Sequence, residues 1–123
     1  MGQTETTREV VTRFESNFNR RDVSLLLADM TEDAVFEHVG PADKVLGRFD
    51  GHEAVGAVFG SFEEHFPGFD LKMVDIIADG DRCACQWTID WDLPDGSRGH
   101  GDGADIFTMR GDKIAVKRSY VTF

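Results

Sequence analysis

The stretch CACQWTIDWDL, residues 83–93, alternates between apolar and polar side chains and predicts one long strand with a buried face. On a strand, every second side chain points to the same side. The apolar side would consist of Cys83, Cys85, Trp87, Ile89 and Trp91. The other side is much more polar, so we expect the tryptophan-bearing face to meet the core.

Further strands lie on both sides of this stretch. Turn-forming residues that include a glycine separate four expected strands, at residues 69–78, 83–93, 101–109 and 113–122. Strands joined in succession by such short turns form an antiparallel meander. In the third of these strands Asp105 shares a face with Phe107 and Met109, so an acidic side chain is expected among apolar ones.

Two helices are predicted near the start of the chain. Thr6 and Glu9 fit a capping box, and apolar residues then recur at helical spacing, which predicts a helix over residues 7–20. Asp22 is a suitable N-cap for a second, short helix that would extend through Met30.

A short strand and a third helix complete the first half of the chain. Residues 34–39 alternate, so Phe36 and His38 would share one face of a strand and place an imidazole beside apolar neighbours. A second capping pair and a clear apolar stripe predict a helix from Asp50 to Phe66, where a Pro-Gly pair ends it.

Helices followed by an antiparallel meander are typical of an α+β domain. Since the sheet has an apolar face to cover, we expect it to curve strongly around the three N-terminal helices and to leave an apolar pocket. The chain of 123 residues has the length of one domain, so a single domain over residues 1–123 is expected.

The charge balance argues against several kinds of partner. Acidic residues outnumber basic ones by 23 to 13, and the net charge of −10 opposes binding to nucleic acid or to an anionic membrane surface. The first residues are polar, and no apolar run reaches the length of a membrane span. We therefore expect a cytoplasmic protein with neither a nucleic-acid nor a membrane partner.

The sequence indicates no cofactor. Cys83 and Cys85 would lie on one strand face, too close for ordinary disulfide geometry, and are expected to be buried thiols. The four histidines are scattered and form no recognisable ligand set, so no metal is expected. No glycine-rich phosphate loop or dinucleotide motif is present either.

Several short motifs together resemble the SnoaL-like group of the nuclear transport factor 2 superfamily, which includes ketosteroid isomerases, polyketide cyclases and limonene-epoxide hydrolases. The motifs extend over nearly the whole chain and are DAVFEH at 33–38, LG at 46–47, GHEAV at 51–55, DIF at 105–107 and GDKI at 111–114. They specify the fold better than the activity, since folds of this kind host unrelated functions.

The resemblance implies a cone-shaped fold whose open end admits a hydrophobic small molecule, commonly in a homodimer joined through sheet faces. By spacing, His38 matches the general-base carboxylate of ketosteroid isomerases and Asp105 matches their protonated aspartate. Their oxyanion-hole tyrosine corresponds to Phe14, so steroid isomerisation itself is not expected. In SnoaL-like cyclases an aspartate at the position of Asp105 is the acid–base group of an aldol closure.

Each candidate residue also has a structural interpretation. Asp105 on an apolar face is costly to leave charged, which suits an acid–base catalyst, but it could instead pair with Lys117 or Arg118. His38 could be a base, an anchor for a ligand carbonyl or a half-buried strand residue. His100 and Tyr120 are possible additional site residues, although strict alternation places His100 on the face opposite Asp105.

Aromatic and apolar side chains are the expected pocket walls, because small-molecule pockets are built mainly from such groups. The candidates are Phe14, Phe36, Phe59, Trp87, Ile89, Trp91, Phe107 and Met109. The favoured function is a cofactor-independent isomerase or cyclase for a hydrophobic carbonyl compound, with Asp105 and His38 as catalytic residues. The alternatives are a non-catalytic binding protein or a dimerisation module of the same fold, and, less favoured, an epoxide hydrolase.

Overall fold

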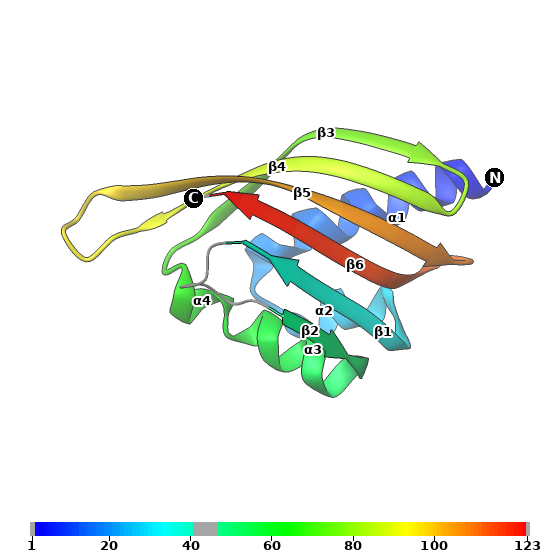
Figure 1. Ribbon diagram of the computed structural model, residues 1–123, viewed down its shortest axis with the longest axis horizontal. Coiled ribbons are helices and arrows are strands. Elements are labelled where there is room, and N and C mark those ends of the chain that lie inside the picture. The colour runs from blue at the N-terminus through cyan, green and yellow to red at the C-terminus, as the bar shows by residue number, and fades with distance from the viewer. Residues whose placement is uncertain (1, 41–46, 123) are drawn as a thin grey trace.

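The computed structural model describes residues 2–40 and 47–122, and these form one curved sheet with all helices on one side (Figure 1). The sheet has six strands in the order β2-β1-β6-β5-β4-β3. This arrangement confirms the α+β class and the strongly curved sheet. Leu46, part of one motif behind the family resemblance, lies outside the described residues.

The second half of the chain forms the predicted meander. Its strands are β3 (Asp70–Asp79), β4 (Arg82–Asp92), β5 (Arg98–Arg110) and β6 (Lys113–Thr122). Each pairs antiparallel with the next. The hairpin of β4 and β5 extends beyond the helices (Figure 1). The predicted apolar face of β4 is buried, and Asp105, Phe107 and Met109 are buried together on β5.

The other edge of the sheet differs from the fully antiparallel arrangement that the sequence predicts. Strand β1 (Met30–Val39) runs parallel to β6, and His38 lies opposite Ser119. A short strand, β2 (Gly47–Asp50), pairs with β1 and was not predicted. A parallel neighbour needs a long crossover connection, and here the whole chain between β1 and β6 provides it.

The two predicted N-terminal helices exist, with shifted boundaries. Helix α1 (Gln3–Asn17) has Gly2 as its N-cap, so Thr6 lies inside the helix and does not cap it. A 3-10 turn, η1 (Phe18–Arg20), follows. Asp22 caps α2 (Val23–Ala28) as expected, accepting a 3.0 Å hydrogen bond from the Ser24 amide. Met30, expected in this helix, is the first residue of β1.

The third predicted helix is divided in two, α3 (Gly51–Gly60) and α4 (Phe62–His65). The division falls at Ser61, whose hydroxyl donates to the Val58 carbonyl at 2.7 Å. Asp50 is the N-cap residue of α3, but its carboxylate accepts from Arg48 rather than from the helix amides. Phe66, expected as the last helical residue, is buried just after α4.

Helix α1 fills much of the hollow of the sheet with aromatic side chains. Phe14 is fully buried, and its ring packs edge-on against Phe18, Phe59 and Phe107 at centroid distances of 5.3, 6.1 and 5.9 Å. Such pairs add to the stability gained from the buried area itself. Within the described ranges, every helix falls short of the length and apolar character that a bilayer span requires.

The tryptophans of β4 lie flat on glycines of β5. Trp87 is paired with Gly103 and Trp91 with Gly99, and a side chain at either glycine would overlap the facing indole. Both glycines are therefore needed for close approach of a large ring to the neighbouring backbone. This packing fixes Trp87 over the inner face of the sheet, next to the buried Asp105.

Candidate functional site

A cavity of about 30 Å³ lies between α1 and the inner face of the sheet. This is room for one or two water molecules. Its apolar lining includes Trp87, Ile89 and several phenylalanines. Its polar lining consists of Glu15, His38, Asp105, Lys117 and Ser119, all of them buried. Ionisable groups gathered on an apolar wall are the most distinctive chemical feature of the described structure.

Asp105 is only 1% exposed and has two charged or polar partners on β6. Ser119 lies directly opposite in the strand pairing, and its hydroxyl donates to Oδ1 at 2.6 Å. Lys117, two residues earlier on the same face, places its Nζ 3.4 Å from Oδ2 and donates to the Ser119 hydroxyl at 2.7 Å. Asp105 thus pairs with Lys117, whereas Arg118 points outward and binds Glu37.

The ammonium group of Lys117 is enclosed by aromatic rings. Its side chain is 4% exposed, and Nζ lies 4.6 Å from the ring centre of Phe36 and 5.3 Å from that of Phe18. A cation over aromatic faces is stabilised by the ring quadrupoles, and more strongly where water is excluded. These contacts and the hydrogen bond to Ser119 hold a positive charge beside the Asp105 carboxylate.

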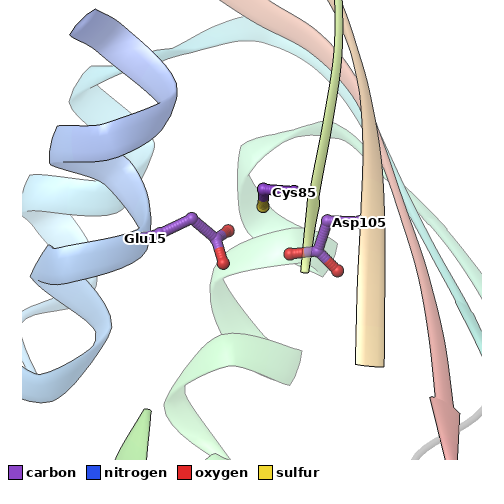
Figure 2. Close-up of side chains that lie close together, drawn as sticks. All are labelled: Glu15, Cys85 and Asp105. Carbon is purple, nitrogen blue, oxygen red and sulfur yellow. The ribbon is translucent and has the colours of Figure 1, made fainter. Parts of the chain in front are cut away.

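Glu15 is a second buried acid, and it was not among the residues predicted from the sequence. It is 2% exposed on α1 and points at Asp105 and Cys85, with acceptor or thiol atoms of the three within 4.8 Å of one another (Figure 2). Burial raises the pKa of the Glu15 carboxyl well above its usual range; the Asp105 charge raises it further and Lys117 opposes the shift. Its Oε1 has no hydrogen-bond partner among the residues that the structure describes.

A signal for Glu15 is present in the sequence. Its spacing from Val11 and Phe18 places it on the apolar side of the helix rather than on the solvent side. A charged residue at such a position is normally buried only if it is paired or neutralised. The helix stripe predicted from Phe14 and Phe18 could therefore have included this acid.

Both cysteines are buried free thiols, as expected. Burial is the largest cause that raises their pKa values, to about 11 for Cys83 and further for Cys85. Glu15, Cys85 and Asp105 are close enough together to hold an ion. Metal ligands must be deprotonated, however, and Lys117 already supplies the cation beside Asp105. The chemistry of this donor set therefore does not favour a metal, and the expectation of a metal-free site stays a prediction.

His38 reaches the same cavity from β1. It is buried, and its ring stacks on Phe36 with a centroid distance of 5.6 Å and an interplanar angle of 26°. The structure therefore brings both predicted catalytic residues, His38 and Asp105, to one cavity. Of the predicted walls, Trp87 and Ile89 line it as well.

The other predicted wall residues lie in the packed core and not at the cavity. They are Phe14, Phe36, Phe59, Trp91, Phe107 and Met109. The reason is that α1 inserts its own aromatic side chains into the hollow, so rings that a wider pocket would expose pack against each other instead. The cavity that remains is far smaller than the roughly 300 Å³ or more typical of ligand pockets.

The two additional candidates lie on the outer face of the sheet. His100 is exposed, with Nδ1 2.7 Å from Asp90 and Nε2 3.3 Å from Asp102. Tyr120 is 37% exposed and packs beside Arg118. Alternation along β5 and β6 sends these side chains away from Asp105, so neither contributes to the cavity.

Solved structures with this fold match nearly the whole chain. Bal32a, from a soil-derived mobile gene cassette, has a TM-score of 0.86 at 21% identity, covering 98% of this chain and 92% of its own. A candidate SnoaL-like polyketide cyclase of Jannaschia sp. CCS1 has a TM-score of 0.83 at 14% identity, with 98% and 88% covered. An NTF2-like protein of unknown function from Mesorhizobium loti has 0.78 at 23%, with 98% and 94% covered.

The sequence itself also matches a family model. No curated protein sequence matches the chain at a significant level. The model of the SnoaL-like domain, however, matches residues 11–117, a range that contains part of α1, most of the sheet and each polar cavity residue except Ser119. The chain therefore belongs to the SnoaL-like domain family.

Proposed function

We propose that this protein is a small acid–base enzyme, of the isomerase or cyclase type, that acts without a cofactor on a hydrophobic carbonyl compound. The observation that carries the proposal is the buried Asp105, held by Lys117 and Ser119 at the wall of an apolar cavity that His38 shares. Enolisation and aldol closure both begin with removal of a proton next to a carbonyl group, and a positioned carboxylate or imidazole can remove it.

The surroundings of Asp105 suit a base that must work repeatedly in a dry site. Ser119 and Lys117 occupy its two oxygens and fix their orientation, which reduces the reorganisation needed during the reaction. Lys117 also keeps the local charge balanced when Asp105 is a carboxylate. His38, whose ring is held flat against Phe36, would anchor or protonate a substrate oxygen from the β1 side of the cavity.

The small cavity restricts how a substrate could bind. A space of about 30 Å³ does not hold a ring system, so aromatic side chains at its rim would have to move apart. Phe62, Phe66 and Phe69 line the cavity from α4 and the segment that follows it. Arg21 fastens this segment, because its guanidinium lies 4.1 Å over the Phe69 ring and binds the Phe69 carbonyl and Glu63.

Exchange of carbonyl α-hydrogens for deuterium tests the proposal without knowledge of the natural substrate. We would incubate the protein in D2O with a panel of small apolar ketones and follow the loss of α-proton signals by NMR. Asp105→Asn should lower any catalysed exchange about 100-fold or more, the usual contribution of a positioned base. Asp102→Asn, on the outer face of the same strand, is the matched control and should leave exchange unchanged.

Exchange that persists at the original rate in Asp105→Asn would refute the role of Asp105. The non-catalytic alternative is favoured by one specific observation, the missing tyrosine hydroxyl at Phe14, which is buried among other rings. A binding protein would be stabilised against heat by ketones or other apolar compounds and would exchange none of their hydrogens. The same panel therefore separates the two functions.

The homodimer stays a prediction. The outer face of the sheet exposes Val39, Ile77 and Tyr120 around a groove of about 520 Å³. Exposed apolar groups gathered on one face are typical of an interaction surface. This supports a second copy as the partner on that face.

A further inference from the structure

The polar residues that line the cavity, Glu15, His38, Asp105, Lys117 and Ser119, are called the inner cluster below. The inner cluster contains two carboxyl groups that reach the same point from different elements. Glu15 comes from α1 and Asp105 from β5, and Figure 2 shows their carboxyl groups pointing toward one another beside Cys85. Both side chains are at least 98% buried. Neither the family comparisons nor the sequence pattern assigned a role to Glu15. Its role is therefore inferred from the positions and burial of the two carboxyl groups.

Charge balance in the cluster favours one shared proton. Lys117 contributes one positive charge, and two buried carboxylates would leave an uncompensated negative charge in a low-dielectric site. Two buried carboxyl groups with oxygens within 4.8 Å of each other therefore retain a proton between them. Desolvation, the largest cause of the raised pKa of Glu15, places that proton on Glu15 at rest.

One oxygen of the Glu15 carboxyl group has no partner in the described part of the chain, so this group is available to interact with a bound ligand. Glu15 lines the cavity, and its buried Oε1 has no hydrogen-bond partner among the described residues. An unsatisfied buried oxygen of this kind costs stability, and the cost is recovered when a ligand or water supplies a partner. A substrate carbonyl in the cavity would meet a neutral acid on the α1 side and a carboxylate on the β5 side.

We propose that Glu15 is a second catalytic residue, a general acid that shares one proton with Asp105 throughout the reaction. The proposal rests on the acid–base function proposed above and adds to it the residue that protonates the carbonyl oxygen. The substrate class that fits is an uncharged carbonyl compound with an α-hydrogen, because a charged one would break the neutrality of the cluster.

The proton transfers balance at every stage. Asp105 takes the α-hydrogen of the substrate as a proton, and the electrons of that C–H bond form the new carbon–carbon double bond. The carbonyl oxygen takes the proton of Glu15, which gives a neutral enol. The site proton has then moved from Glu15 to Asp105, and the net charge is unchanged. In the second half the enol returns its proton to Glu15, and Asp105 protonates carbon.

Glu15→Gln is the decisive variant, since the amide keeps the size of the side chain and cannot act as an acid. With the ketone panel in D2O, we expect it to lose at least 10-fold in exchange rate and to flatten the alkaline side of the pH profile. Glu9→Gln, an exposed acid on the same helix, is the matched control and should change neither. An unchanged rate and pH profile in Glu15→Gln would overturn the proposal while leaving the acid–base function standing.

A titration tests the shared proton without any substrate. Because the folded-state pKa of Glu15 is raised, its contribution to stability is complete below the usual glutamate value near pH 4.3 and is lost as the pH rises through the folded value. As the pH rises from the usual glutamate value to the folded-state pKa of Glu15, the melting temperature of the wild type should therefore fall relative to that of Glu15→Gln.

Other titrating groups face Glu15 and are common to both proteins. They are Cys83 and Cys85 on β4, Asp105 on β5, Lys117 on β6 and His38 across the cavity. The difference between the two pH profiles isolates Glu15 to first order, and carbon-13 NMR of its carboxyl carbon reports the same titration directly. A carboxyl that titrates at the usual glutamate value would overturn the shared proton, even if the protein catalyses exchange.

Glu15→Met covers the case in which the amide disturbs folding, because it fills the same space with an apolar side chain. It should fold and should lose exchange as Glu15→Gln does. If Glu15 were only structural, both variants would alter stability without altering the pH dependence of the exchange rate. If the wild type catalyses no exchange, the proposed function fails while the titration still decides whether the two carboxyls share a proton.

Discussion

Strand β5 carries an ionic cluster on each of its faces, and the two clusters have similar geometry in opposite surroundings. On the inner face, Asp105 lies 3.4 Å from Lys117. On the outer face, His100 lies 2.7 Å from Asp90 and 3.3 Å from Asp102. The inner side chains are 1% and 4% exposed, whereas the imidazole of His100 is 55% exposed.

The two clusters show that burial, more than the distance between the charges, determines how strongly an ion pair affects the stability of the fold. Exposed charges lose little hydration and are screened by salt, so their pairing contributes little to folding. Buried charges have lost their hydration, and each then depends on its partner. We therefore expect the inner cluster to be sensitive to every single substitution and the outer cluster to tolerate them.

The largest effect is expected when the inner pair is broken. Lys117→Met removes the ammonium and leaves the Asp105 carboxylate buried with Ser119 as its remaining direct partner in the cluster on β6. Breaking a buried pair in this way costs about 3–5 kcal/mol. Urea denaturation should show a loss of this size in the free energy of unfolding.

The double variant Lys117→Met with Asp105→Asn tests the cause. Removing both charges should recover most of the loss, because buried ion pairs can often be replaced by uncharged groups at little cost. A double variant as unstable as Lys117→Met would mean that packing of the lysine against Phe36, rather than its charge, stabilises the fold.

A smaller effect is expected from the packing beside the inner cluster. Gly103→Ala would place a methyl group against the indole of Trp87, which must then shift. Overpacking of this kind costs about 1–3 kcal/mol. Asp102→Ala, the adjacent residue with an exposed side chain, should be nearly neutral. Urea denaturation followed by tryptophan fluorescence measures both, and equal effects would show that the inner face is no more tightly packed than the outer one.

The strand faces could be predicted from sequence because they depend on local alternation alone. Every second residue from Cys83 to Trp91 is buried as expected, and Asp105 falls with Phe107 and Met109 by the same rule. Asp22 was likewise found as a helix cap because capping involves neighbours in the chain. Position on a face and position at a helix end are short-range properties.

The composition of the inner cluster was not predictable in this way. Glu15 becomes a buried acid because α1 docks onto residues far along the chain, Cys85 and Asp105. The narrow cavity depends on the summed volumes of aromatic side chains from α1, α3 and the sheet, which no local pattern records. The parallel pairing of β1 with β6 also follows from tertiary packing, since no short turn connects the two strands.

The smallest effect is expected on the outer face. The hydrogen bond to Asp90 is the main cause that raises the pKa of His100, and its charge and that of Asp102 act in the same direction. The stability that protonated His100 contributes is complete below the usual histidine pKa near 6.5, and it is lost as the pH rises through the pKa of His100 in the folded state. Because the group is exposed, salt should reduce the shift.

NMR titration of His100 at low and high salt, together with the melting temperature of His100→Gln, completes the comparison. We expect a raised pKa that moves toward the ordinary value in salt and a melting temperature that matches the wild type. A large loss of stability in His100→Gln would break the contrast between the two faces. An unchanged melting temperature would support burial against α1 as the cause of the difference in stability between the two clusters, because both clusters involve the same strand and the same kinds of charge.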